Sequence, residues 1–440
     1  MEESSTVPST KLQYPLLPRT LNATPLQISA IAIFLLCLGF VYWWSLPLEF
    51  NLKYDSRNFF DSDGEFITRQ FIAGKTYTHN NHILYHYLGA KICELVGCGK
   101  NAHFIALVHK SFSVLLGTIG IATVFLASWW WLGRVLPALA TALFLGGTSS
   151  YWFFSASIDT YIPHLAAALI SVWLSLWALR SNARIAYLAL GVAIGISFLF
   201  RTDGALCGVL AVVAFACKEQ RWSRLVLCAG AAAVVGIPAY IMIAVSHYHV
   251  APNDLVFWAL GHLDRPEVNS GVWGSVANVT PSSLWLVFVN NLFYAVFIPG
   301  VEATRSASFI LHYRGLAGGL LGPGLWICVV AWVLISQFGN RRPDRDGVWL
   351  IALAGIWFVP RVIFYTWWDP FDPFLFSVLS LPAAWLLLLA LLNSSRCSSG
   401  KSDTGTAAST AVGLVSVLAL LVWVHNAVYL ISPLRTFALQ

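Results

Sequence analysis

Residues 28–46 read ISAIAIFLLCLGFVYWWSL, an apolar run without a single charge. A helix needs roughly 20 apolar residues to cross a hydrocarbon core of about 30 Å. Polar or mixed residues precede the run, and no small-residue cleavage site accompanies it. We therefore interpret it as a retained transmembrane helix behind a cytoplasmic tail (residues 1–27), and not as a signal peptide.

Composition extends this interpretation to the whole chain. The 440 residues are 58% hydrophobic and only 10% charged, with a mean hydropathy of +0.70, which is typical of an integral membrane protein. We expect an all-α polytopic fold with about eleven transmembrane helices. They lie near 28–46, 111–131, 136–156, 161–179, 185–200, 204–217, 225–246, 316–337, 348–366, 374–392 and 409–431.

The basic residues predict the orientation of these helices. Cytoplasmic loops carry an excess of Lys and Arg. Here the basic side chains fall in alternate loops: Arg134, Arg180, Arg184, Lys218, Arg221, Arg224, Arg341, Arg342, Arg345, Arg396 and Lys401. The amino terminus is then cytoplasmic and the carboxy terminus outside. Because these loops account for much of the net charge of +6, we expect no nucleic-acid partner.

Two long segments fall on the outer side. Residues 47–110 should hold amphipathic helices along the membrane surface, and residues 247–315 contain an apolar stretch, 284–300, that we expect to be interfacial or re-entrant. The predicted organisation is an N-terminal membrane module (28–246) with outer loop 47–110, the outer segment 247–315, and a C-terminal membrane module (316–440).

Tryptophan and cysteine suggest two local features. The run 129–131 (WWW) ends an apolar segment, as residues of an interfacial aromatic belt do. Most of the eight cysteines lie in apolar segments, where a small core residue is the simple interpretation. Cys93 and Cys98 lie in the outer loop, where a local disulfide is the alternative.

The acids gather on the outer face in this topology. They are Asp55, Asp61, Asp63, Glu65, Asp159, Asp203, Asp254, Asp264, Asp369 and Asp372. The densest group is residues 61–65 (DSDGE), which follows the first helix. Such a group fits acid/base chemistry, although a solvated turn and helix cap would have the same sequence.

Histidines follow in the same outer loop, in residues 78–89 (THNNHILYHYLG). His82 and His86 are four residues apart and would share a helix face. That face suits an anionic group or a metal, but no zinc-protease pattern accompanies it. We include His79 and Tyr85 with them as candidate substrate-binding residues.

Three further motifs fall at outer helix ends. Asp159, followed by Tyr161, lies between two spans and could instead cap the next helix. Residues 201–204 (RTDG) form the apex of a short hairpin, where Arg201 and Asp203 are either site residues or a local ion pair. Residues 361–373 combine an arginine with aromatic residues and acids, among them Trp368 and Asp369, and an interface anchor is the alternative.

Residues 63–67 (DGEFI), 79–89 and 155–163 resemble, in that order, motifs of the GT-C class of integral-membrane glycosyltransferases. The likeness is greatest to bacterial relatives of protein O-mannosyltransferases, and it extends over residues 28–220 and 368–370. Residues 158–161 (IDTY) stand where a Glu-Val-Tyr is expected, and residues 79–82 (HNNH) replace a His-Pro-Pro-Gly type of sequence. The resemblance implies a GT-C bundle, a catalytic base in the first outer loop, and a second acid that assists it or holds the acceptor or a metal.

The function expected is transfer of a sugar from a polyprenyl-phosphate donor to a lipid, glycan or protein acceptor on the outer face. Asp61 or Asp63 would be the base, with Glu65 and Asp159 as further catalytic candidates, and a direct displacement would invert the anomeric centre. The candidate phosphate-binding residues are Arg57, Arg201, Arg305 and Arg361.

Two other classes of function compete with this one. A secondary transporter or channel would use the same acids for ions, and an envelope assembly protein would use them for neither purpose. For the enzyme we expect no required cofactor, with room for a divalent metal. We also expect contact with membrane lipids and a place in a bacterial inner membrane, with the site facing the periplasm.

Overall fold

The apolar runs fold as helices, because a chain in lipid must satisfy its backbone hydrogen bonds within each segment. The structure is a computed structural model. It describes residues 24–52, 63–74, 82–181, 183–216, 222–260, 276–298, 300–303, 309–311, 315–338, 345–368, 378–397 and 404–439.

The N-terminal part of the chain forms a series of helices joined by short turns. The helices are α1 (Pro25–Ser45), α2 (Gly64–Ile72), α3 (Ile83–Val96), α4 (Ala102–Leu132), α5 (Val135–Gly147), α6 (Ser149–Ala156), α7 (Tyr161–Ser181), α8 (Arg184–Phe200), α9 (Gly208–Ala216), α10 (Trp222–Ser246) and α11 (Leu255–Leu260). Single 3₁₀ turns are η1 (Leu48–Leu52), η2 (Thr202–Cys207) and η3 (Pro252–Asp254).

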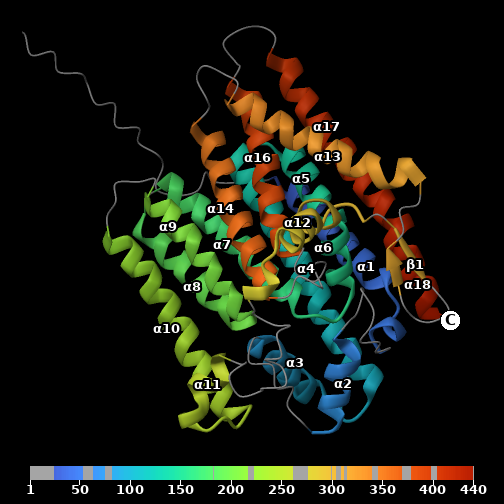
Figure 1. Cartoon of the computed structure of the whole chain (residues 1–440), viewed down its shortest axis with the longest axis vertical. Coiled ribbons are helices and arrows are strands. Elements are labelled where there is room, and N and C mark those ends of the chain that lie inside the picture. Colours follow the sequence, from blue (N-terminus) through green and yellow to red (C-terminus); the bar gives the residue numbers. More distant parts are fainter. Residues whose placement is uncertain are drawn as a thin grey trace, which may run out of the picture.

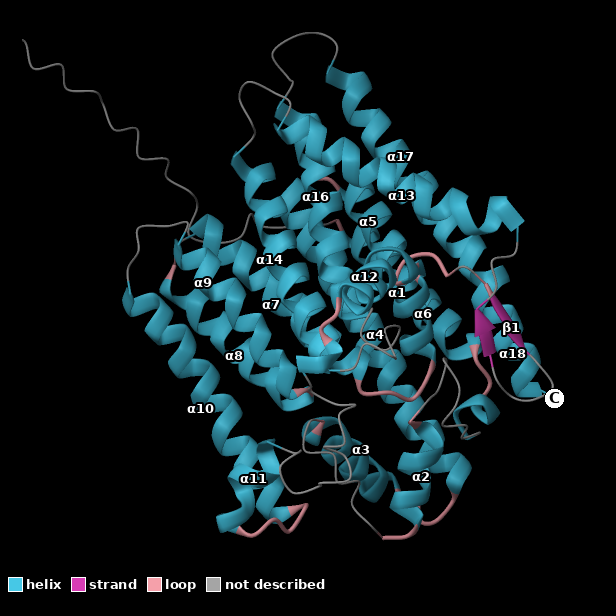
Figure 2. Cartoon of the chain, viewed as in Figure 1, coloured by secondary structure: helices cyan, strands magenta, loops and turns pink. Residues whose placement is uncertain are grey.

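The C-terminal part adds a second group of helices and one small hairpin. The helical elements are η4 (Val276–Asn278), α12 (Pro281–Val289), the π-turn η5 (Asn290–Tyr294), α13 (Gly315–Phe338), α14 (Arg345–Trp368), η6 (Val378–Ser380), α16 (Leu381–Cys397), α17 (Thr404–Asn426), the π-turn η7 (Ala427–Ile431) and α18 (Ser432–Leu439). Strands β1 (Val301–Ala303) and β2 (Phe309–Leu311) pair antiparallel, with Val301 opposite Leu311, beside α18 (Figure 2).

The predicted all-α membrane fold is confirmed. Six helical segments are long and apolar enough to cross a membrane: 25–45, 102–132, 161–181, 222–246, 345–368 and 409–438. Shorter apolar helices occupy 135–147, 184–200, 202–216, 324–335 and 378–393. Each predicted segment overlaps one of these helices, but several of the helices are too short to establish eleven crossings.

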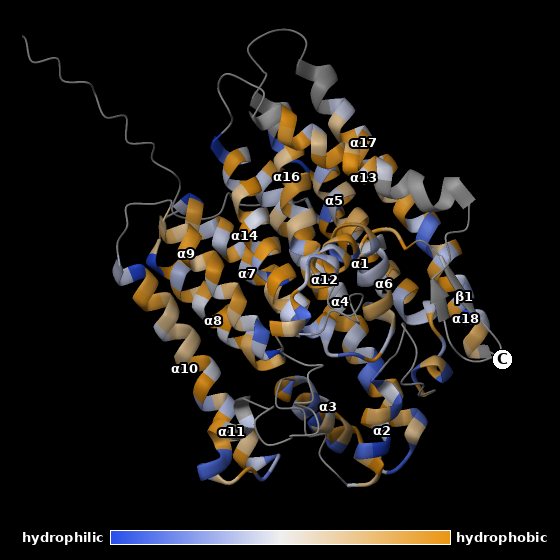
Figure 3. Ribbon diagram, in the orientation of Figure 1, coloured by the Kyte–Doolittle hydropathy of each residue, from blue (hydrophilic) through white to orange (hydrophobic). Residues whose placement is uncertain are grey.

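The helices form one bundle with a smaller layer at one end. In Figure 1, α8, α9 and α10 lie along one side of the bundle, and α13, α16 and α17 lie at the end away from α2 and α3. The expected helices of the first outer loop are present as α2 and α3, which lie together beneath the bundle (Figure 1). Hydrophobic residues run through the bundle, while hydrophilic ones are prominent on α2 (Figure 3).

Two sequence expectations about the bundle are wrong in detail. The span predicted at 136–156 breaks at Thr148 into α5 and α6. The buried residues 295–298 pack against this break: the backbone amide of Ser150 donates to the Ala295 carbonyl at 3.2 Å. The tryptophans at 129–131 are buried, and the Arg180 guanidinium lies 3.6 Å from the centre of the Trp131 ring. They are therefore packing residues and not a lipid-facing belt.

The apolar stretch at 284–300 folds as the short pair α12 and η5 before entering the bundle. Asn290 and Asn291 are buried, and each amide nitrogen donates to a carbonyl one turn earlier in its own helix, Leu286 O at 2.9 Å and Val287 O at 2.8 Å. This geometry assigns no membrane depth, so its interfacial or re-entrant position stays a prediction.

Candidate active site

Two acids that are far apart in sequence meet at the lower end of the bundle. Asp63 is the N-cap residue of α2, and Asp159 lies in the break between α6 and α7. Asp159 is 2% exposed, and its Oδ1 accepts hydrogen bonds from the backbone amides of Thr160 at 2.6 Å and Tyr161 at 3.4 Å. The carboxylate therefore serves the start of α7, as the capping interpretation required, and also lies close enough to Asp63 to interact electrostatically.

Asn51, which the sequence did not single out, holds these two acids in place. Its buried side-chain Oδ1 accepts from the backbone amide of Ile158 at 2.7 Å, next to Asp159. Its backbone oxygen also lies only 2.3 Å from where a Cβ on Gly64 would be, so α2 approaches η1 at a distance that only glycine allows. Asn51 thus contacts the segments that carry both acids.

Lys110 of α4 fixes the turn that carries Asn51. Its ammonium group donates to the carbonyl of Trp43 at 2.7 Å and to that of Leu46. These are carbonyls at the end of α1, which a helix leaves without internal partners. A cation is favourable at that end of a helix, so Lys110 sets where α1 stops and η1 begins.

Burial changes the acidity of both acids. Loss of hydration raises the pKa of Asp63, and the nearby positive charge of Arg201 opposes that rise. Loss of hydration is also the main cause that raises the pKa of Asp159, and the charge of Asp63 raises it further. Two carboxyl groups in one buried site cannot easily both ionise. At neutral pH the pair is suited to hold a proton or to accept one.

Arg201 forms the positive side of the site. Its Nε donates to Asp203 Oδ1 at 3.0 Å, with both side chains 7% exposed. Asp203 Oδ2 in turn accepts from the hydroxyl of Tyr365 at 2.6 Å, and the Arg201 guanidinium lies 4.3 Å from the centre of the Tyr161 ring. Within the described part of the chain, Nη1 of Arg201 is buried without a hydrogen-bond partner.

Arg361 is the second buried guanidinium, one helical turn before Tyr365 on α14. It is 1% exposed, and it donates to the carbonyl of Trp357 at 3.1 Å and contacts Cys207 Sγ at 3.7 Å. Among the described residues no carboxylate lies within ion-pair distance, and its Nε has no partner. A buried, un-neutralised guanidinium is costly unless it binds an anion, so Arg361 has the features of an anion-binding residue.

The histidine segment reaches the acids through Tyr85. The Tyr85 hydroxyl lies 3.3 Å from Ser113 Oγ, and its pKa is raised, mainly by burial, with a contribution from Asp159 and Asp63. The His86 ring is 5.5 Å from the Tyr85 ring, and His82, at the start of α3, is 6.4 Å from His86. His82 and His86 thus lie beside each other, as their spacing predicted, and Tyr85 packs against His86.

Other candidates lie elsewhere or outside the described residues. Glu65 forms an ion pair with Arg69 one turn along α2, and Trp368 packs on Phe364 with ring centres 6.0 Å apart. Five candidates fall outside the described part of the chain: Arg57, Asp61, His79, Arg305 and Asp369.

The described residues bring together no group of three or more His, Cys, Asp or Glu side chains that could hold a metal. Cys93 and Cys98 are both buried, and their thiols are not bonded to each other in this structure.

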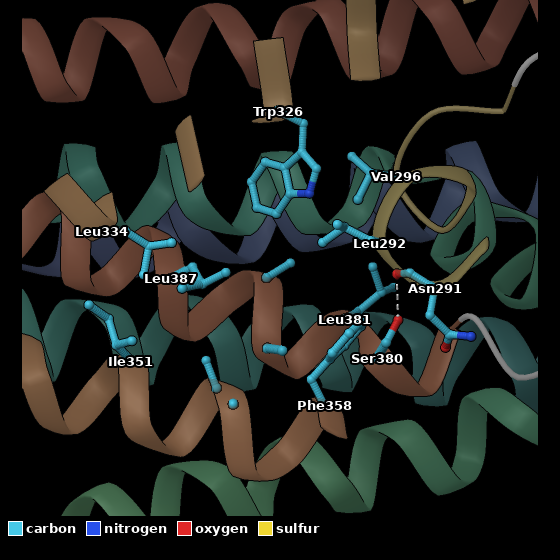
Figure 4. A pocket seen from close by; sticks show the side chains of 14 residues that line it. Asn291, Leu292, Val296, Trp326, Leu334, Ile351, Phe358, Ser380, Leu381 and Leu387 are labelled. Atoms are coloured by element: carbon cyan, nitrogen blue, oxygen red, sulfur yellow. Dashed lines mark hydrogen bonds between the residues drawn. The ribbon is translucent and has the colours of Figure 1, made fainter. Parts of the chain in front are cut away.

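An apolar pocket of about 190 Å³ lies between α13, α14, α16 and η5. Trp326, Phe358 and Leu387 project into it, and at one end the Ser380 hydroxyl donates to the carbonyl of Asn291 at 2.9 Å (Figure 4). Phe358 precedes Arg361 by three residues on α14, so the pocket and the buried guanidinium share a stretch of helix. Its walls suit an apolar chain and offer little to a sugar.

Comparison with known proteins finds a solved structure with a similar fold. No protein-family model matches the sequence, and no curated protein matches it. The structure is similar to apo ArnT from Cupriavidus metallidurans, a GT-C glycosyltransferase, with a TM-score of 0.55 and 15% identity over 93% of this chain and 78% of that one. It is also similar, with a TM-score of 0.37 and 17% identity, to the donor-bound Pmt1–Pmt2 protein O-mannosyltransferase complex of S. cerevisiae, over 54% of this chain and 35% of that one. The second score is too low to add to the assignment. The chain is an integral membrane protein whose fold is similar to that of ArnT, a GT-C glycosyltransferase.

Proposed function

We propose that this protein transfers a sugar from a polyprenyl-phosphate donor to an acceptor on the outer face of the membrane. The observation that carries the proposal is the meeting of Asp63 and Asp159 with the buried guanidinium of Arg201. Asp203 and Tyr365 link Arg201 to α14, the helix that also carries the buried Arg361. A base opposite an anion site is the arrangement that displacement of a phosphate leaving group requires. The likeness of the fold to ArnT supports the class of enzyme.

Asp63 is the proposed base. It would take the proton from the acceptor hydroxyl as the oxygen attacks the anomeric carbon, and the bond from that carbon to the donor phosphate would break. A single displacement of this kind inverts the anomeric centre. Asp159, which already caps α7, would orient the acceptor and share the proton of the buried pair.

Arg361 and Arg201 are the proposed ligands of the donor phosphate. Negative charge grows on the phosphate as the sugar leaves, and a guanidinium can meet two of its oxygens at once. Nη1 of Arg201 and Nε of Arg361 are both buried and unpartnered within the described residues. Tyr85 lies near both acids and packs against His86, and an aromatic ring at such a place can stack on a sugar face.

The acceptor is a lipid, glycan or protein, and no cofactor is required, although a divalent metal at the acids is compatible with their chemistry. The amino terminus is cytoplasmic and the site faces the periplasm of a bacterial inner membrane. The buried Arg361 guanidinium, which has no carboxylate partner among the described residues, favours this proposal over a non-catalytic assembly protein.

Binding of polyprenyl phosphate tests the proposal without knowledge of the sugar or acceptor, because every such donor shares this leaving group. Purified protein in nanodiscs should bind polyprenyl phosphate, and should bind the uncharged polyprenol more weakly. Replacing Arg361 with Gln should weaken phosphate binding about 10- to 100-fold, the range expected for lost charge-assisted hydrogen bonds. Equal affinity of the folded wild type for the phosphate and the alcohol would contradict the proposal. Unchanged phosphate binding by a folded Arg361→Gln variant would contradict the role of Arg361.

A further inference from the structure

The turn that ends α3 brings Cys93 and Cys98 together. Gly97 adopts a left-handed conformation (φ 71°), the Cys98 amide donates to the Cys93 carbonyl at 3.0 Å, and the Gly97 amide donates to the Glu94 carbonyl at 3.4 Å. This pair of hydrogen bonds defines a Schellman motif, which is frequently accompanied by contact between the side chains at these two positions.

The two thiols are sealed in a small apolar cluster. Cys93 is 1% and Cys98 3% exposed, and Phe71 of α2 and Phe104 of α4 pack on them together with Ile105. The two thiols interact with each other. The pKa of Cys93 is raised mainly by burial and further by the neighbouring thiol of Cys98.

Reactive and metal-binding roles fit this environment poorly. The thiolate is the form that attacks electrophiles and binds metals, and the raised pKa disfavours it. No third metal-binding side chain joins the pair among the described residues. If the two cysteines only made an apolar contact, two aliphatic side chains could replace them, and these would resist oxidation.

We propose that Cys93 and Cys98 are joined by a disulfide in the protein as it exists in its membrane. The hydrogen bond between their backbones keeps the two residues within the short span that a disulfide bridges. The oxidant is a dithiol–disulfide oxidoreductase of the outer compartment. Two S–H bonds break and one S–S bond forms, and the two electrons and two protons reduce the oxidant's disulfide to a dithiol.

Oxidation precedes folding of the outer layer. Until α2 and α4 cover the turn, both thiols are open to an oxidant, and afterwards the disulfide is shielded from reductants. The bond would fix the end of α3, the helix that carries Tyr85 and His86, to the turn that begins α4. This inference rests on the outer position of residues 47–110 in the proposed function, but not on sugar transfer.

Differential labelling of the wild-type protein tests the proposal. Cells producing the full chain are quenched in acid, and the protein is denatured and treated with N-ethylmaleimide. It is then reduced, treated with a second alkylating agent of different mass, digested and analysed by mass spectrometry. Cys93 and Cys98 should carry the second label. Cys228, buried in α10 as a free thiol, is the control and should carry the first.

Two results would overturn the proposal. One is the first label on both Cys93 and Cys98 in the wild type, whatever the cause of their reduction. The other is a Cys98 that still carries the second label in the Cys93→Ser variant, since its partner would then be another thiol. Polyprenyl-phosphate binding measured on the same preparation shows separately whether the proposed function stands.

Discussion

Asp63 and Asp159 show how burial can make a base from an ordinary acid. An exposed aspartate is too weak a base to take a proton from a hydroxyl group near neutral pH. Removing it from water raises its pKa and so its basicity. The cost of burying the pair is offset by Arg201, whose charge interacts with both. Strongly shifted acids in a cleft are the features expected of a functional site.

The pH dependence of sugar transfer should reveal this shift. Asp63 must be ionised to act as a base, and its pKa lies above the ordinary value of 3.8. Activity should therefore fall as the pH is lowered through the raised pKa, well before an ordinary aspartate would be protonated. The acid limb of a profile of kcat/KM against pH measures it. A limb at the ordinary value, with the enzyme still folded, would contradict the assignment.

At the scale of single elements, the positions of the helices could be predicted from sequence, but their breaks and contacts could not. Uncharged apolar runs locate α1, α7 and α8 within a few residues, because lipid demands such runs. The break at Thr148 lies inside an apolar run and is stabilised by residues 295–298, far along the chain. Asn51 has the sequence context of a loop residue, and its partner, the Ile158 amide, lies 107 positions away.

Part of the candidate site could also be predicted from the sequence. The rarity of charged residues in this chain makes Arg201 and Arg361 candidate site residues. Their placement around one site depends on the packing of α8, η2 and α14, which no local pattern encodes. Cys207 and Ser197, which lie beside these arginines, are small residues in apolar segments and gave no signal.

The approach of α2 to η1 gives a prediction at this scale. In Gly64→Ala the new methyl group would meet the Asn51 carbonyl, and α2 would shift together with Asp63 at its start. A displacement of the order of 1 Å in a reacting group can cost about 100-fold in rate. Donor turnover should fall by roughly that factor.

Gly208→Ala is the matched control for Gly64→Ala. Gly208 also begins a helix, α9, and a methyl group there meets open space. Thermal unfolding of the two variants separates loss of the fold from loss of the geometry. Equal turnover by Gly64→Ala and Gly208→Ala would show that the contact with Asn51 does not position the base.

At the scale of the whole molecule, the bundle collects at one end residues from segments that the sequence separates widely. η1, α2, the α6–α7 break, η2 and α14 all contribute. In the proposed orientation that end faces outward. α4 offers a direct test, because Lys100 precedes one end of this long helix and Arg134 follows the other, and both side chains are exposed.

Cysteine labelling in intact cells should distinguish the two ends of α4. In a background without the exposed Cys37 and Cys328, Lys100→Cys should react with a membrane-impermeant maleimide, and Arg134→Cys should react only after permeabilisation. The opposite pattern would reverse the orientation and place the acids in the cytoplasm.

The measurement that tests the account most directly is consumption of donor by purified wild type, Asp63→Asn and Asp254→Asn, against a panel of polyprenyl-phosphate sugars. Asp254 is an exposed acid of the other outer segment, so its variant controls for loss of a carboxylate as such. Wild type and Asp254→Asn should consume one donor at similar rates, and Asp63→Asn should be slower by about 10²- to 10⁴-fold. Donor consumption by a folded Asp63→Asn at the wild-type rate would contradict the account.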